Sequence, residues 1–248
     1  GVLEDEARRP GVERAPREPQ GGINLSAQIN DRLADLLPER MVLCADLEAP
    51  TAHKQRLQAF TAEHRGGAYV HCGVREHVMG AMANGMAAHG GVIALAVTYL
   101  AFSDYERPAM RMAALMGLPV KFVFSHDSIG VGKNGPTHQP VEILASLRAL
   151  PNMIVMAPKD ENELRHMLKT AIEHPGPAAL RYPRGNGFGV SLDAECKTIP
   201  IGECELLRDG DQVVVLALGT LAHVALEAAH ALGEEGISAA VVNARFAK

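Results

Sequence analysis

Residues 92–124 read VIALAVTYLAFSDYERPAMRMAALMGLPVKFVF, and this stretch decides the fold. Its apolar run Val92 to Val97 predicts a strand, Ser103 to Met116 predicts a helix, and Val120 to Phe124 predicts a second strand. A helix between two almost wholly apolar strands is typical of parallel strands that are buried on both faces. The stretch therefore predicts one crossover unit of an α/β fold.

The same alternation continues on both sides of this unit. Further strands are predicted at Met41 to Cys44, Ala68 to His71, Met153 to Met156, Ala178 to Tyr182, Gln212 to Leu218 and Ala239 to Asn243. Further helices are predicted at Leu25 to Leu37, Arg75 to His89, Pro140 to Leu150, Glu161 to Glu173 and Ala222 to Leu232. Repetition of this kind implies an α/β protein with a mostly parallel sheet flanked by helices.

The two ends of the chain differ from this region. Residues 1–22 are rich in Glu, Arg, Pro and Gly, which predicts a disordered or linker arm. We place one domain at residues 23–197, with a seam near Leu192 to Ile199, and a partial second α/β domain at residues 198–248. The second domain holds one strand–helix–strand unit, which cannot cover both faces of its sheet. We therefore expect the chain to be a fragment of a longer chain or a subunit that a partner completes.

Composition narrows the classes of partner. The 248 residues carry a net charge of −5, so we expect no nucleic acid and no anionic membrane as a partner. The longest apolar runs have the length of strands and are far shorter than the roughly 20 residues of a membrane span. The four cysteines form no CxxC pair and have no metal-like spacing with histidine, which favours free thiols, a cytoplasmic location and no metal site.

Polar loops follow several of the predicted strands. They are Cys72 to His77, Ser125 to Ser128, Gly135 to Gln139, and Arg181 to Gly187. Ligands of open α/β sheets bind at the carboxyl ends of the strands. Polar loops that gather at one such edge predict a ligand site there.

Two features of this edge have more than one interpretation. Glu76 follows Gly73 and lies in the first turn of a predicted helix, where it either stabilises the helix dipole or serves as a functional acid. Tyr99, Phe102 and Tyr105 follow a strand at spacings of three, either as a core stripe or as a platform for a flat ring.

The remaining polar candidates are two histidines and two arginines. His126 and His138 flank a glycine-rich loop that lacks the phosphate-loop pattern, and they line either a polar cleft or ordinary loops. Arg181 and Arg184 form a stiff cationic turn, suited either to an anionic substrate or to surface ion pairs.

Several short motifs carry a resemblance to a known family. The sequences GVREH at 73–77, HDSIG at 126–130 and GPTHQP at 135–140 closely resemble those of transketolases. The sequences LPNMIVMAP at 150–158 and RYPRGNG at 181–187 are similar to 1-deoxy-D-xylulose-5-phosphate synthases, which are relatives in the same superfamily. The resemblance extends from Leu25 to the end of the chain.

The resemblance implies a thiamine-diphosphate-binding fold and a specific cofactor. Family members bind thiamine diphosphate between two domains of a dimer, and the middle domain holds the aminopyrimidine ring. The match implies that Glu76 is catalytic, because the family's glutamate hydrogen-bonds a ring nitrogen and thereby drives removal of the thiazolium C2 proton. Tyr99, Phe102 and Tyr105 match the aromatic pocket around the pyrimidine.

The resemblance also implies residues that bind the substrate. His126, His138 and Arg184 match positions that contact the sugar or its phosphate, and His138 is in addition a catalytic candidate. Arg181 is a further candidate for substrate binding. Asn134 stands where the family commonly has Asp, so the usual sugar-phosphate specificity stays open.

One motif of the family is missing. Transketolases bind Mg²⁺ and the diphosphate with a GDG motif and a distant Asn on an N-terminal domain, and Asp209-Gly210-Asp211 is not that motif. We therefore expect Mg²⁺ to be bound by a domain that is absent from this chain. The expected partner is either a second copy in a homodimer or a subunit that carries the diphosphate-binding domain.

Three functions follow from these motifs. The first is a transferase of aldehyde or ketone groups, which moves a two-carbon ketol unit between sugar phosphates. The second is the synthase reaction, which joins pyruvate and glyceraldehyde 3-phosphate. The third is a non-catalytic assembly or regulatory protein on this fold. The His126 loop favours the first over the second, since the synthases usually have an Arg-containing loop there.

Overall fold

The computed structural model describes residues 37–47 and 57–248. The predicted arm at residues 1–22 and nearly all of the predicted helix at Leu25 to Leu37 lie outside the described residues.

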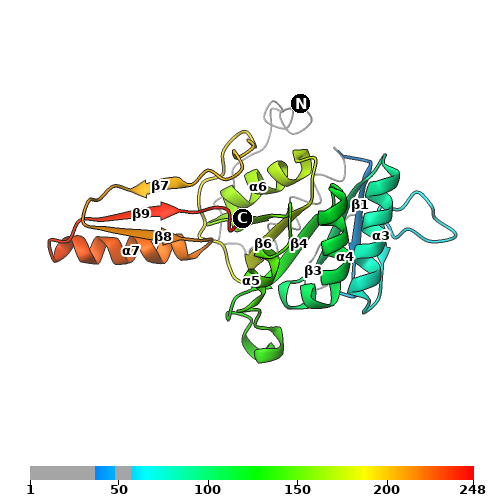
Figure 1. Cartoon of the computed structure of the whole chain (residues 1–248), viewed down its shortest axis with the longest axis horizontal. Coiled ribbons are helices and arrows are strands. Elements are labelled where there is room, and N and C mark those ends of the chain that lie inside the picture. Colours follow the sequence, from blue (N-terminus) through cyan, green and yellow to red (C-terminus); the bar gives the residue numbers. More distant parts are fainter. Residues whose placement is uncertain (1–36, 48–56) are drawn as a thin grey trace.

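A six-stranded parallel sheet forms the larger part of the structure (Figure 1). Its strands run in the order β2-β1-β3-β4-β6-β5, and all neighbouring pairs are parallel. The strands are β1 (Arg40–Cys44), β2 (Tyr69–His71), β3 (Ile93–Tyr99), β4 (Lys121–Asp127), β5 (Ile154–Met156) and β6 (Ala178–Pro183). Their parallel pairing confirms the predicted α/β class.

Helices cover both faces of this sheet. One face packs against α3 (Glu76–His89), α4 (Ser103–Met116) and α5 (Ile143–Arg148), and the other packs against α6 (Glu161–Glu173). Small residues such as Ala83 and Ala113 let α3 and α4 approach the sheet closely. The arrangement places the start of each helix near the carboxyl edge of the sheet.

Several elements differ from the sequence prediction near that edge. The strand β3 runs on to Tyr99 rather than ending at Val97, and β6 runs on to Pro183. The strand predicted to end at Phe124 continues to Asp127. Ser125 pairs with Tyr99 of β3, and after a register shift Asp127 pairs with Pro183 of β6. The helix predicted from Pro140 is shorter, and α5 begins only at Ile143.

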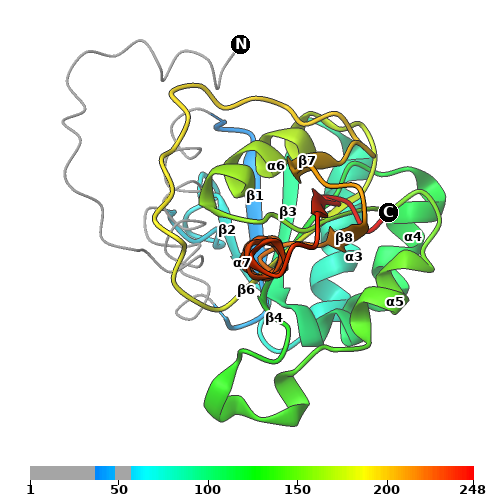
Figure 2. The same ribbon diagram turned by 90° about the vertical axis from the view of Figure 1, so that its left-hand side faces the viewer.

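A second sheet lies beside the first, with α7 (Leu221–Glu234) along one face (Figures 1 and 2). It contains β7 (Glu205–Arg208), β8 (Val213–Ala217) and β9 (Ala239–Asn243) in the order β7-β9-β8. The antiparallel strand β7 was not predicted, so the unit has one strand more than the expected strand–helix–strand. Apolar side chains on the face away from α7 are exposed, among them Leu206, Val214 and Leu216. The predicted boundary at residue 197 lies in the connection between β6 and β7 and stays a prediction.

The end of the chain returns to the larger sheet. Residues 245–248 run antiparallel to β5: Val155 N donates to the Lys248 carbonyl oxygen at 3.0 Å, and Ala247 N donates to the Val155 carbonyl oxygen at 2.8 Å. The second sheet is therefore joined to the first by backbone hydrogen bonds as well as by its connecting segment.

Candidate functional site

Glu76 is the first residue of α3, directly after the turn that follows β2. Gly73 has a φ of +64°, a conformation that glycine adopts without the steric cost of a side chain. The Glu76 side chain is buried, with 6% exposed, and burial raises the pKa of its carboxyl, partly offset by a hydrogen bond from backbone. An acid with a raised pKa at a strand end has the properties expected of a proton donor or acceptor.

Aromatic rings gather at the carboxyl ends of β3 and β4. Tyr99 stacks on His126 with ring centroids 3.5 Å apart and lies nearly parallel to Phe102 at 5.7 Å. The Phe102 ring lies edge-on to His138, with ring centroids 5.3 Å apart. Its centroid is 6.3 Å from that of Tyr105, whose ring is tilted by 35°. The structure thus brings all three predicted aromatic residues and both predicted histidines into one cluster.

Exposure differs along this cluster. Tyr99 is buried, Phe102 is half-buried, and Tyr105 is 66% exposed. A core stripe would bury all three rings, so the gradient favours a surface that a flat ring can reach.

His126 lies near the end of β4, where the pairing of β4 with β6 becomes irregular. Its φ of +57° is unusual for a residue with a side chain, and such conformations cluster at functional sites. Its Nδ1 pairs with the Ser125 hydroxyl at 2.9 Å. Burial, together with the positive charge of Arg184 and electrostatic interaction with His138, lowers the pKa of His126 to about 4. The ring is therefore neutral at neutral pH.

Of the other predicted side chains, His138 and Arg184 lie near the aromatic cluster, whereas Arg181 is paired with an acid. His138 pairs through Nδ1 with the Thr137 hydroxyl at 2.8 Å, and Arg184 donates to the Val131 carbonyl oxygen at 3.3 Å. The charge of Arg184 also acts on Tyr99, so this guanidinium lies close to the aromatic cluster. By contrast, Arg181 forms an ion pair with Asp127.

The sequence reasoning did not single out Glu106, which is 0% exposed on α4. Glu106 lies close enough for the charge of Glu76 to act on it. A glutamate in a helix with other charged residues carries no signal for burial, so only the packing of α3 against α4 reveals it.

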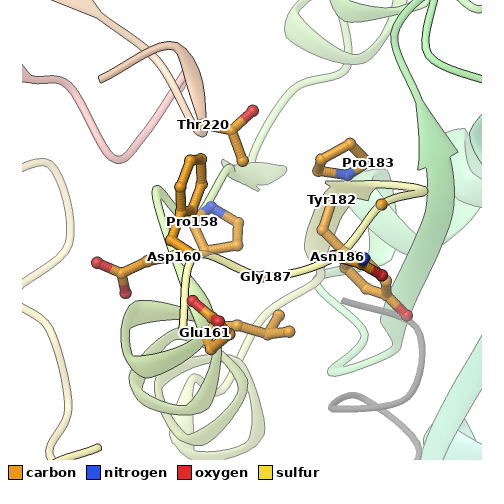
Figure 3. A pocket seen from close by; sticks show the side chains of 11 residues that line it. Pro158, Asp160, Glu161, Tyr182, Pro183, Asn186, Gly187 and Thr220 are labelled. Carbon is orange, nitrogen blue, oxygen red and sulfur yellow. The ribbon is translucent and has the colours of Figure 1, made fainter. Parts of the chain in front are cut away.

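A cavity that is partly open to solvent lies where the loops after β5 and β6 approach Thr220, the residue before α7 (Figure 3). Its lining comes from the loop after β5, the first turns of α6, the end of β6 with the loop that follows it, and Thr220 directly before α7. The Glu161 carboxylate in its wall accepts a hydrogen bond from Gly189 N at 2.6 Å and so holds the loop after β6 in place. The cavity is lined by neither Glu76 nor the aromatic cluster.

In the described part of the chain, no group of three or more His, Cys, Asp or Glu side chains is arranged to hold a metal ion. No helix of residues 37–47 and 57–248 is both long enough and apolar enough to cross a membrane.

Comparison with protein families gives two matches. A family described as transketolase, pyrimidine binding domain, matches residues 23–188, and one described as transketolase, C-terminal domain, matches residues 202–248. The first match covers more than half of the chain. The chain therefore belongs to the transketolase family.

Curated relatives carry two different names. The transketolase of Treponema pallidum is 44% identical over 211 residues, which are 82% of this chain and 32% of that protein. The 1-deoxy-D-xylulose-5-phosphate synthase 1 of Geobacter sulfurreducens is 43% identical over 230 residues, 92% of this chain and 35% of that protein. The synthase 1 of Geobacter metallireducens is 60% identical over 134 residues, 54% of this chain and 21% of that protein. The chain thus spans about a third or less of the length of these relatives.

Solved structures give the same family. The transketolase of Campylobacter jejuni superposes with a TM-score of 0.82 at 28% identity, over 99% of this chain and 38% of that one. A structure named as a split gene transketolase, an inactive beta4 tetramer, superposes with a TM-score of 0.75 at 29% identity, over 91% of this chain and 71% of that one.

Proposed function

We propose that this chain is the pyrimidine-binding part of a thiamine-diphosphate-dependent enzyme that transfers a two-carbon ketol unit between sugar phosphates. The observation that carries the proposal is the pairing of a buried glutamate at the start of α3 with an aromatic cluster at the same sheet edge. An aminopyrimidine needs these two things: apolar rings against its faces and an acid at its ring nitrogen.

The residues of this chain fit the cofactor. When bound, thiamine diphosphate supplies a nucleophilic carbon that attacks a carbonyl group of the substrate. Glu76 would hold or give up a proton at the ring nitrogen, and its raised pKa suits proton sharing with a weakly basic nitrogen. Phe102 and Tyr105 would bind the pyrimidine by apolar contact and exclude water from it.

The substrate would approach from the side of His126, His138 and Arg184. Neutral His126 can donate or accept a hydrogen bond to a sugar hydroxyl group, and His138 can do the same and move a proton. Arg184 would bind a phosphate or another anion at the far end of the substrate. Arg181 stays a candidate, although its charge is already matched by Asp127.

The diphosphate and Mg²⁺ would be held by residues outside this chain. The sequence has no GDG motif, and Mg²⁺ with its oxygen ligands is the usual means of binding such phosphates. We propose that a second copy or a partner subunit provides that domain. The similarity to a split gene transketolase supports a partner subunit. Cysteines without CxxC spacing favour a cytoplasmic location.

A second candidate function has its own support. The segment that is 60% identical to a protein named 1-deoxy-D-xylulose-5-phosphate synthase 1 favours a reaction between pyruvate and glyceraldehyde 3-phosphate. The two reactions share the cofactor and differ in the donor substrate. Assays of the assembled enzyme with pyruvate and with a ketose phosphate as donor would separate them.

Exchange of the thiazolium C2 proton tests the shared part of both reactions. The chain is mixed with a subunit that carries the diphosphate-binding domain, together with thiamine diphosphate and Mg²⁺, and exchange into D₂O is followed by NMR. We expect Glu76→Gln to slow the exchange by roughly 10²–10⁴-fold, the usual effect of losing a general acid or base.

The control for this experiment is Glu142→Gln, which changes an exposed glutamate and should leave the exchange rate unaltered. Exchange at the wild-type rate in Glu76→Gln would contradict the proposed role of Glu76. The chain alone should bind the cofactor only weakly in a calorimetric titration, and micromolar binding would contradict the need for a partner domain.

A further inference from the structure

Glu106 is a carboxyl group buried without hydrogen-bond partners. Glu106 lies in the first turn of α4, four residues after Phe102, and its side chain is 0% exposed. Among the described residues, neither of its side-chain oxygens has a hydrogen-bond partner. An ionised carboxylate in such surroundings is strongly destabilised, and the group instead takes up a proton.

The packing of α3 explains how Glu106 fits there. Glu76 and Gly80 lie one turn apart on the same face of α3. A Cβ atom on Gly80 would come within 2.9 Å of Glu106 Cγ and Oε1 and within 2.8 Å of Ala109 Cβ. The space left by the missing side chain of Gly80 is therefore filled by Glu106, which lies against the face of α3 that carries Glu76.

The charges around Glu106 agree with this geometry. Burial raises the pKa of Glu106 well above its usual range, and the negative charge of Glu76 raises it further. Glu76 is less deeply buried, and the causes of its own smaller rise do not include Glu106. Cys72, directly after β2, is the other titratable group nearby, and burial, together with electrostatic interaction with Cys44, raises its pKa to about 11. Two acids this close ionise one after the other, and Glu76 loses its proton first.

We propose that Glu106 is a neutral carboxylic acid at neutral pH and acts as a positioning residue that keeps the single negative charge of the pair on Glu76. This inference rests on the proposed function for its consequence: the charge then lies on the acid that would face the ring nitrogen of the cofactor. Glu106 itself touches neither the cofactor nor the substrate.

Infrared spectroscopy of the chain without cofactor tests the protonation directly. A protonated carboxylic acid has a C=O stretching band that a carboxylate lacks. We expect this band at neutral pH in the wild type and in Glu76→Gln, and we expect it to be lost in Glu106→Gln. Absence of the band from the wild type at neutral pH, or its survival in Glu106→Gln, would overturn the proposal.

The pH dependence of stability is a second readout that a purely structural role would not change. The folded state keeps a proton on Glu106 that the unfolded chain releases above the ordinary carboxyl range, so the wild type loses stability as pH rises from there. Glu106→Gln removes this loss. The folding equilibrium constant of the variant relative to wild type should therefore rise with pH, by up to about tenfold per pH unit. Asp104→Asn, an exposed acid on the same helix, is the matched control and should give a flat ratio.

A second variant and the spectra of Glu76→Gln test the proposal even if Glu106→Gln is unstable. If Glu106→Gln does not fold, Glu106→Met provides an apolar side chain of similar length. If neither folds, the spectra of wild type and Glu76→Gln still decide, since loss of the band in Glu76→Gln would overturn the proposal. Because no cofactor is present, a failure of the proposed thiamine diphosphate site would leave these spectra unchanged and would appear only in the C2 exchange experiment.

Discussion

Replacement of Glu163 by alanine should loosen the second sheet from the first. This carboxylate is 2% exposed and accepts hydrogen bonds from Asn243 Nδ2 at 2.9 Å, Arg245 Nε at 2.8 Å and Lys159 N at 2.7 Å. Its removal leaves the fully buried Asn243 amide without its main acceptor. Arg245 then keeps only Glu205 as an acidic partner, and Lys159 keeps Glu205 and Asp160.

The magnitude follows from these contacts. Hydrogen bonds to a charged group are each worth about 1.5–3 kcal/mol, so a simple sum over three bonds would give an upper limit of about 9 kcal/mol. The real loss is smaller, because Glu205 still neutralises Arg245 and Lys159, whose side chains are 19% and 18% exposed and can recruit water. Removing one member of a buried ionic cluster typically costs about 3–5 kcal/mol, which is the expected fall in the free energy of unfolding.

Urea unfolding and hydrogen exchange, read by mass spectrometry, measure this effect. We expect amides of β7, β8 and β9 to lose more protection than those of β3 and β4, because the lost contacts join the second sheet to α6. Glu173→Ala is the matched control: it lies on α6, its side chain is 51% exposed, and its loss should cost no more than about 1 kcal/mol. A Glu163→Ala variant as stable as this control, or an equal loss of protection in both sheets, would refute the reasoning.

Two further predictions concern the core of the larger sheet. Gly80→Ala should destabilise the protein by about 1–3 kcal/mol, because the added methyl group clashes with Ala109. Gly85→Ala, in open space on the same helix, should stabilise it by up to about 1 kcal/mol. Thermal unfolding of both variants would check this, and equal effects would contradict it. Burial lowers the pKa of Lys121 to about 8, so the folded state releases a proton that the unfolded chain keeps up to about pH 10.5. Stability of wild type relative to Lys121→Met should therefore rise above pH 8, by at most about 1.4 kcal/mol per pH unit, and a constant difference in urea midpoints from pH 7 to 9.5 would contradict it.

Most of the larger sheet could be predicted from the sequence, since buried parallel strands and amphipathic helices leave strong patterns. The predicted helices at α4 and α6 have the observed bounds. The strand β7 was missed because its four residues, Glu205 to Arg208, begin and end with charged side chains and pair antiparallel at an edge. Strand order and the return of residues 245–248 to β5 depend on contacts between distant segments, which no local pattern encodes.

The site was predictable to the extent that parallel strands place their carboxyl ends at one edge. That rule correctly predicts that Tyr99 and His126 lie together, because the two residues lie at or next to the carboxyl ends of neighbouring strands. It could not separate Arg181 from Arg184, which look alike in the sequence. The register of β4 against β6 separates them: a shift after Phe124 leaves Asp127 beside β6, where it forms an ion pair with Arg181. Arg184, just beyond the strand, donates to a carbonyl oxygen and keeps its positive charge toward the aromatic cluster, so it is the better placed of the two to bind an anionic substrate.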